Sequence, residues 1–258
     1  MDLGIEGLRV MVSAGADGIG LEIARAFVRE GARVHVCDVD EKALERLAGT
    51  DATLTWTACD VASRAQVARF FEAGVAILGG LDCLVNNAGI AGPTGRIDEI
   101  DPEAWDRCLA VDLTGQFNCA RLAVPHLRRS GNASIMNVSS LAGRLGFAMR
   151  TPYASAKWGV VGLSRSLAIE LGPDNIRVNA LLPGVIAGER QKRVLSAKAH
   201  ARGVAFEEME RLALSFTSLK EYVTPQELAD LVAFVASPRG RMISGQSLSV
   251  CGDTNMLA

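Results

Sequence analysis

Tyr153 and Lys157 are the residues of this sequence best suited to proton chemistry. They are four positions apart, so on a helix their side chains share one face, one turn from each other. A phenol exchanges protons poorly near neutral pH because its pKa is about 10, but a neighbouring ammonium favours the phenolate. A tyrosine tuned in this way can pass a proton to or from an alcohol oxygen. The pair alone also fits an ordinary surface helix, so its meaning depends on the surrounding elements.

A glycine-rich segment, residues 13–20, stands between a predicted strand at residues 8–12 and a predicted helix at residues 21–30. Such a turn directs backbone N–H groups and the positive end of the helix at one place, which suits a pyrophosphate. Gly18 and Gly20 would let the backbone approach that ligand closely. The alternative is an ordinary tight turn between a strand and a helix.

A second predicted strand, residues 33–38, ends in Asp38, which lies 18 residues after Gly20. A carboxylate near this spacing accepts hydrogen bonds from the ribose hydroxyls of a bound dinucleotide. It also repels a 2′-phosphate, and Asp17 in the glycine turn adds a second negative charge, so NAD is favoured over NADP. The alternative role for Asp38 is to cap the next predicted helix, residues 41–48.

Strands and helices alternate along the rest of the chain. Further strands are predicted at residues 54–59, 82–85, 133–138, 176–182 and 247–250. Further helices are predicted at residues 63–78, at 102–129 with an interruption near Asp112 and Gly115, from Tyr153 to about Leu171, and at 225–236. This order predicts an α/β fold with one domain, residues 1–258, built on a single doubly wound, Rossmann-like parallel sheet of about seven strands with helices on both faces.

The composition excludes several classes of protein. Of 258 residues, 49% are hydrophobic, which allows a large core, and the net charge of −2 argues against a nucleic-acid binder. No apolar run reaches membrane-spanning length, and the first residues lack the layout of a signal peptide. The six cysteines form no CxxC pair and the three histidines are far apart, so no metal site is expected. We interpret the cysteines as reduced residues of a cytoplasmic protein.

These motifs together resemble the classical short-chain dehydrogenase/reductase family from about residue 8 to residue 252. The glycine motif of the family matches residues 13–20, its Asn-Asn-Ala-Gly matches residues 86–89, and its Pro-Gly turn matches residues 183–184. Its serine, thirteen positions before the tyrosine, matches Ser140, and its Tyr-x-x-x-Lys matches Tyr153 and Lys157. Five elements in the family's order are far more specific than any one of them.

The resemblance implies hydride transfer between a nicotinamide and a carbonyl or alcohol carbon. Tyr153 would exchange the proton with the substrate oxygen, Ser140 would orient that oxygen, and Lys157 would hold Tyr153 partly ionised and bind the nicotinamide ribose. Asp60 and Val61 would touch the adenine. The remaining expected cofactor contacts are Ser13, Gly15, Asp17, Gly18, Ile19, Gly20 and Asp38 on one side, and Asn87, Ala88, Gly89, Pro183, Gly184, Val185 and Ile186 on the other.

The sequence departs from the family pattern at three functional positions. Ala14 stands where the first glycine of the turn is usual, which is tolerable if its local φ is negative. Asp112 replaces an asparagine associated with a water relay to the lysine; a relay through the backbone carbonyl would accept aspartate, whereas one that needs the amide would not. Gly188 replaces a threonine that often contacts the carboxamide, so one cofactor hydrogen bond is expected to be missing.

The resemblance further implies an NAD-dependent oxidoreductase that interconverts a secondary alcohol and a ketone of a small molecule, as a homotetramer. We expect its substrate to be a small polar hydroxy compound such as a polyol, a sugar or a hydroxy acid. One alternative is an NADPH-dependent reductase of 3-oxoacyl thioesters, which shares the same catalytic residues. An alternative of another class is a catalytically silent NAD-binding regulator.

A variable substrate lid is expected at residues 188–222, and its first half is basic. Arg144 and Arg150 flank the stretch between Ser140 and Tyr153, and Arg96 follows the Asn-Asn-Ala-Gly turn. One of these arginines could receive a substrate carboxylate. Because charged side chains usually face water, we expect each of them to have a solvated surface role instead.

Overall fold

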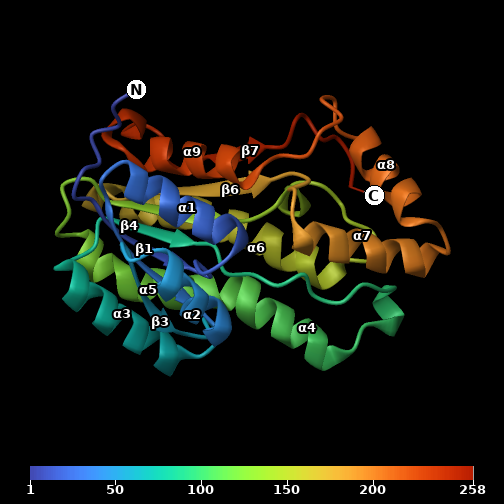
Figure 1. Ribbon diagram of the computed structural model, residues 1–258, viewed down its shortest axis with the longest axis horizontal. Helices are drawn as coiled ribbons and strands as arrows, with labels where there is room; N and C mark the ends of the chain where they lie inside the picture. The colour runs from blue at the N-terminus through green and yellow to red at the C-terminus, as the bar shows by residue number, and fades with distance from the viewer. Residues whose placement is uncertain (258) are drawn as a thin grey trace.

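The computed structural model describes residues 1–257, which form a three-layer sandwich around one sheet (Figure 1). All seven strands run parallel, in the order β3-β2-β1-β4-β5-β6-β7. The predicted fold class is therefore confirmed. The strands are β1 (Arg9–Ser13), β2 (Arg33–Asp38), β3 (Leu54–Ala58), β4 (Cys83–Asn86), β5 (Ser134–Val138), β6 (Arg177–Pro183) and β7 (Ser247–Val250).

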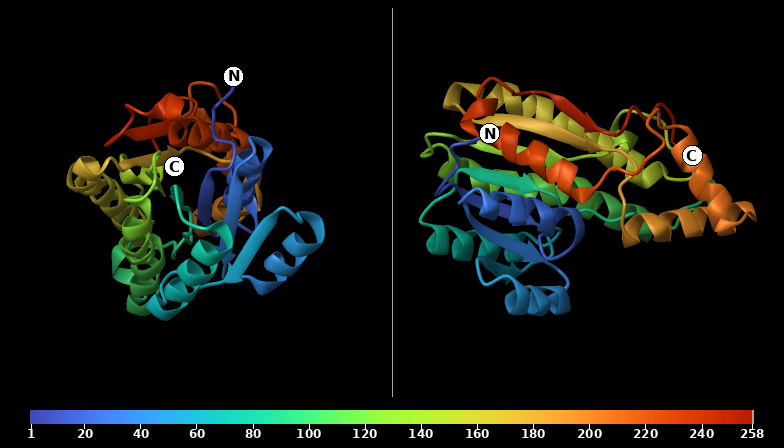
Figure 2. Two further views of the ribbon diagram at one scale, coloured as in Figure 1. Left: turned by 90° about the vertical axis from the view of Figure 1, so that its left-hand side faces the viewer. Right: turned by 45° about the horizontal axis from the view of Figure 1, so that its top comes forward.

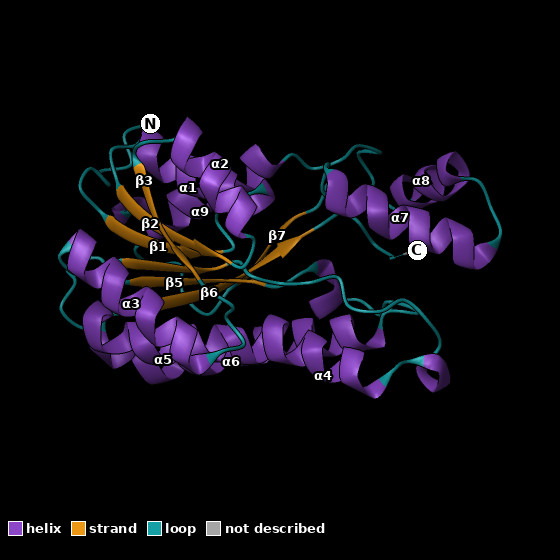
Figure 3. Cartoon of the chain, turned by 60° about the horizontal axis from the view of Figure 1, so that its bottom comes forward, coloured by secondary structure: helices purple, strands orange, loops and turns teal. Residues whose placement is uncertain are grey.

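Helices cover both faces of the sheet, as Figure 3 shows. On one face lie α1 (Gly18–Arg29), α2 (Glu41–Thr50) and α9 (Pro225–Ala236). On the other lie α3 (Arg64–Leu78), α4 (Pro102–Leu109), α5 (Gly115–Leu127) and α6 (Thr151–Leu171). Because both faces are covered, the central strands are buried along almost their whole length, which is typical of parallel sheets.

Successive residues of β1 divide between the two cores. Val10 and Val12 pack with α1 and α9, whereas Met11 packs with α3 and α5 on the opposite face. This alternation follows from the two-residue period of a strand. Because a shift of one residue would move these side chains to the wrong face, the alternation fixes how the strands pair. The pairing in turn fixes where the carboxyl end of each strand lies along the edge of the sheet.

Helix α1 begins at Gly18, three residues before its predicted start. Asp17 is extended and its side chain accepts a hydrogen bond from the Gly18 N–H, so it caps the helix. Gly18 and Gly20 therefore lie in the first turn, where backbone N–H groups have no partner within the helix.

The predicted interruption of the long helix is confirmed as a π-helical turn, Ala110–Thr114, between α4 and α5. Turns of this kind are rare and often occur at functional sites. Here it carries Asp112 into the protein interior, where the residue is fully buried.

Two helices project beyond the carboxyl ends of the strands, as the right-hand view in Figure 2 shows. They are α7 (Glu189–Arg202) and α8 (Phe206–Ser215), and both lie within the predicted lid. They share a small core of their own that includes Leu195, Ala199 and Met209. No helix in residues 1–257 is both long and apolar enough to cross a membrane.

Candidate active site

A cleft of about 730 Å³ lies between the sheet and the lid. Its walls come from the turn after β1, the ends of β4, β5 and β6, the start of α6 and one side of α7. Met256 and Leu257, near the C-terminal end of the sequence, also line it. Most of the predicted site residues line this cleft: Asp17, Gly18, Ile19, Asp38, Asn87, Gly89, Ser140, Tyr153, Lys157, Pro183, Gly184, Val185 and Ile186.

Other predicted residues shape the cleft from behind. The Ser13 hydroxyl accepts hydrogen bonds from the backbone N–H groups of Asn87 and Ala88, both at 3.0 Å, and so ties β1 to the turn after β4. Gly15 packs so closely on Val36 that a Cβ at Gly15 would lie 2.7 Å from the Cβ of Val36. Ser13, Gly15 and Ala88 thus position the cleft without lining it.

Asp60 and Val61 also lie outside the cleft lining. The Asp60 carboxylate forms an ion pair with Arg107 at 2.9 Å and accepts a hydrogen bond from the Ala62 N–H. Val61 is buried, and a Cβ at Gly115 would lie 2.6 Å from its side chain. Their expected contact with the adenine stays a prediction.

The glycine turn provides a bare backbone surface. A Cβ at Gly20 would lie 2.0 Å from the carbonyl oxygen of Ala14 and 2.5 Å from Nδ2 of Asn87, so no side chain fits there. Asn87 Nδ2 donates hydrogen bonds to the carbonyl oxygens of Ser13 and Ala14, at 3.1 and 3.0 Å. With the capped start of α1, this surface fits the pyrophosphate of a dinucleotide.

Ala14 does not have the negative φ on which its tolerance depends. Its φ is +50°, in the left-handed region that favours glycine. The backbone must turn there so that the Gly15 N–H can donate to the carbonyl oxygen of Cys37 at 2.9 Å. The glycine-rich turn thus keeps this backbone conformation although residue 14 is not glycine, and Ala14 is strained as a result.

The Asp38 carboxylate lies at the end of β2, partly exposed, and lines the cleft. Oδ2 accepts a hydrogen bond from the Ala16 N–H at 3.2 Å, and Oδ1 accepts one from the Asp40 N–H at 3.1 Å. The helix cap is Asp40 instead, whose side chain accepts from the Ala43 N–H. The capping alternative for Asp38 is therefore wrong.

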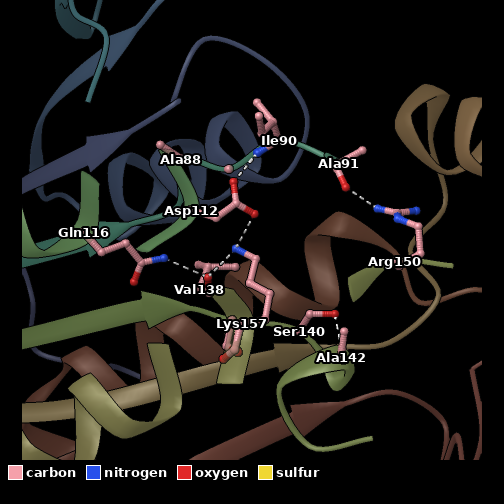
Figure 4. A network of polar contacts seen from close by, with 12 residues as sticks. Ala88, Ile90, Ala91, Asp112, Gln116, Val138, Ser140, Ala142, Arg150 and Lys157 are labelled. Carbon is pink, nitrogen blue, oxygen red and sulfur yellow. Dashed lines mark hydrogen bonds and ion pairs between the residues drawn. The ribbon is translucent and has the colours of Figure 1, made fainter. Parts of the chain in front are cut away.

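Tyr153 and Lys157 share one face of the first turns of α6. The Lys157 Nζ lies 5.5 Å from the centre of the Tyr153 ring and donates to the carbonyl oxygen of Val138 at 3.2 Å. The Ser140 Oγ, at the end of β5, accepts from the Ala142 N–H at 3.1 Å, which leaves its own O–H free to donate (Figure 4).

Asp112 lies against Lys157 in this polar centre. Its Oδ2 is 3.5 Å from the Lys157 Nζ, and its Oδ1 accepts from the Ile90 N–H at 2.6 Å (Figure 4). A Cβ at Gly89 would lie 3.1 Å from that Nζ, so the glycine leaves room for the contact. Asp112 therefore balances the charge of Lys157 directly, which an asparagine could not do.

Gly188 and its neighbours connect the cleft to the lid. Gly188 has a φ of +144° and precedes the first residue of α7, without a side chain that could bind a carboxamide. Arg190, in the first turn of α7, reaches back and donates to the carbonyl oxygen of Gly89 at 3.0 Å. This bond joins the lid to the turn after β4.

Arg150 lies inside the site and not on the solvated surface. Its side chain is only 2% exposed, and its guanidinium lies 5.1 Å from the centre of the Tyr153 ring and 5.3 Å from that of Phe147. Nη2 donates to the carbonyl oxygen of Ala91 (Figure 4). The expectation of a solvated role is thus wrong for Arg150, whereas Arg96 and Arg144 are exposed.

The comparisons with known proteins agree with this geometry. The protein family described as enoyl-(acyl carrier protein) reductase matches residues 14–253. A cis-4-hydroxycyclohexanecarboxylate dehydrogenase of Sinomonas cyclohexanicum is 36% identical over 94% of both chains. A D-beta-hydroxybutyrate dehydrogenase of Cupriavidus necator is 32% identical over 93% of this chain and 95% of its own.

Among solved structures, a variant of actinorhodin polyketide ketoreductase with NADPH superposes with a TM-score of 0.88. It is 32% identical and covers 94% of this chain and 95% of its own. Three structural features described above agree with these similarities: the order of the strands, the glycine turn, and the cleft lined by Ser140, Tyr153 and Lys157. The chain therefore belongs to the classical short-chain dehydrogenase/reductase family of oxidoreductases.

Proposed function

We propose that this protein is an NAD-dependent oxidoreductase that interconverts a secondary alcohol and a ketone of a small molecule. The observation that carries the proposal is the placement of Tyr153, Lys157 and Ser140 along one cleft that also contains the glycine turn. The cofactor would rest on that turn, with Asp38 facing its ribose, and Val185 and Ile186 would meet its carboxamide. When bound, NAD supplies the hydride acceptor.

In the direction of alcohol oxidation, the phenolate oxygen of Tyr153 accepts the hydroxyl proton of the substrate as its C–H bond breaks. The Ser140 hydroxyl, free to donate, hydrogen-bonds to the same substrate oxygen and holds it near Tyr153. The Lys157 ammonium stabilises the phenolate electrostatically. In the reverse direction, Tyr153 returns the proton to the carbonyl oxygen.

The charge of the adenosine end supports NAD over NADP. Asp17 and Asp38 both line that end, and a 2′-phosphate there would meet two carboxylates. Arg25 also lines it, but its charge is already paired with Glu22 at 3.0 Å and Asp51 at 2.8 Å. Better turnover with NADP⁺ than with NAD⁺ would contradict this preference.

An NADPH-dependent reductase of 3-oxoacyl thioesters is the second candidate. It is favoured by the similarity to a polyketide ketoreductase with NADPH. A catalytically silent NAD-binding regulator would retain cofactor binding without turnover. The two relatives named for hydroxy-acid oxidation favour a small hydroxy compound over a thioester.

The decisive experiment is a panel of polyols, sugars, hydroxy acids and secondary alcohols with NAD⁺ or NADP⁺, followed by the absorbance of the reduced cofactor. We expect turnover with NAD⁺ and a loss of at least about a thousandfold in Tyr153→Phe, since proton transfer and its coupling to hydride transfer are lost together. A silent regulator would bind NADH and show no turnover with any compound.

We further propose a cytoplasmic homotetramer. All six cysteines are free, and five of them are buried, as in a protein kept under reducing conditions. Phe117 on α5 and Trp158 on α6 are 43% and 52% exposed on the outer helical layer, which favours packing against another copy. Cell fractionation tests the location, and light scattering tests the assembly.

A further inference from the structure

Arg150 is a buried cation with unused hydrogen-bonding capacity at the centre of the site. Only its Nη2 has a hydrogen-bond partner, whereas Nε and Nη1 have none. None of the ion pairs in residues 1–257 includes Arg150. Arg150 lines the cleft three residues before Tyr153, so these donors lie beside the space where a molecule would bind.

Such a placement is unfavourable without a ligand. Burial removes the guanidinium from water and lowers the pKa of Arg150, with Arg190 adding repulsion, although the group stays protonated. A buried cation normally has an anionic partner as well as full hydrogen bonding. Within residues 1–257, Arg150 stacks on Phe147 and Tyr153 but forms no ion pair.

The surrounding charge favours an anion at this end of the cleft. The Lys198 Nζ lies 3.9 Å from the centre of the Phe147 ring, on the lid helix, and Arg190 approaches from the first turn of the same helix. Of the acidic residues that line the cleft, Asp17, Glu22 and Asp38 belong to the glycine turn, α1 and β2. The fourth, Glu189 on the lid helix, is paired with Lys192 at 2.8 Å. The cleft is therefore electrostatically polarised, with cations near Tyr153.

We propose that Arg150 binds a carboxylate of the substrate, so that the alcohol oxidised beside Tyr153 belongs to a compact hydroxy acid. This inference rests on the proposed function and deepens it. A carboxylate matches the planar donors of a guanidinium.

The test measures binding without turnover. Cyclohexanecarboxylate and cyclohexanecarboxamide have nearly the same shape and lack a hydroxyl group, so neither is oxidised. Each is titrated calorimetrically into the full-length protein saturated with NADH, and again with NADPH. We expect the wild type to bind the carboxylate at least tenfold more tightly than the amide. Acetate and acetamide are compared in the same way, as a pair of smaller compounds.

Three variants locate the effect. Arg150→Met should abolish the carboxylate preference, whereas Arg150→Lys should retain part of it, because it keeps the charge and loses the planar donors. Arg144→Met removes an exposed arginine of the same segment and should leave the preference unchanged. Thermal unfolding of each variant shows whether it is folded.

Equal binding of carboxylate and amide by the wild type would overturn the inference. A preference that persists in folded Arg150→Met would also overturn it, as would tighter binding of inorganic phosphate than of the carboxylates. These failures are distinct from a failure of the proposed function, because turnover of neutral alcohols with NAD⁺ could persist without any charge preference. Conversely, carboxylate binding without turnover of any hydroxy compound would contradict the enzyme assignment alone.

Discussion

At the scale of single residues, the carboxylate of Asp112 distinguishes this site from one with an asparagine at that position. Asp112→Asn keeps an oxygen for the Ile90 N–H and removes the negative charge beside Lys157. The buried ammonium of Lys157 then loses the carboxylate beside it. We expect the free energy of unfolding, measured with urea, to fall by about 3 kcal/mol.

The control for this prediction is Asp106→Asn, which removes an exposed carboxylate from neighbouring α4. Its free energy of unfolding should match that of the wild type. An unchanged free energy of unfolding in Asp112→Asn would refute a stabilising ion pair between Asp112 and Lys157.

Ala14 offers a second test at this scale, on stability. Its left-handed φ of +50° costs about 1 kcal/mol relative to glycine. Ala14→Gly should therefore raise the free energy of unfolding, measured with urea, by about 0.5–1 kcal/mol. Ala48→Gly, in the exposed part of helix α2, should lower it by a similar amount. A loss of stability in both variants would contradict the strain at Ala14.

At the scale of elements, His35 joins β2, β3 and α3. It is fully buried, hydrogen-bonded to Thr55 at 2.8 Å and Thr57 at 3.0 Å, and stacked on Phe70. Burial lowers the pKa of His35 to about 4, below the value near 6.5 expected when the chain is unfolded. Between these values the unfolded chain binds more protons, so stability must fall as the pH falls.

We expect up to about 3 kcal/mol of the free energy of unfolding to be lost between pH 6.5 and pH 4 through this residue alone. In His35→Gln, which has no titrating group, that contribution should vanish even if the stability at pH 7 is lower. Urea unfolding at several pH values measures it. An unchanged acid slope in the variant would show that other groups cause the acid sensitivity.

Elements were predictable from sequence where local signals agree. The strand β2 and the helix α9 were predicted with their observed bounds. The structure adds a Thr224–Glu227 capping box at the start of α9. Within the site, the spacing of Tyr153 and Lys157 was sufficient to place them on one helical face. The start of α1 was predicted three residues late, because glycine has a low helix propensity and the cap at Asp17 overrides it.

The burial of Arg150 could not be read from sequence. It depends on Phe147, on the Ala91 carbonyl and on the lid, which are brought together only by the fold. The left-handed Ala14 likewise reflects its hydrogen-bonded neighbours and not its own preference. Positions of this kind, where local rules fail, mark strained or functional sites.

At the scale of the whole molecule, the exposed aromatic residues of the outer layer test the proposed tetramer. Trp158→Glu places a charge on α6 where another copy would pack, so we expect light scattering to give a smaller assembly than for the wild type. Trp56→Glu, on the edge strand β3 and 40% exposed, is the matched control and should leave the mass unchanged. A wild-type protein that is already monomeric would contradict the tetramer.

The wall formed by Met256 and Leu257 has a practical consequence for the laboratory. An affinity tag fused after these residues would begin beside the lining of the cleft. The opposite end of the chain lies at the far side of the molecule, near the start of the sheet (Figure 1). Purification handles therefore belong on the N-terminus, and kinetic constants obtained from C-terminally tagged protein would partly describe the tag.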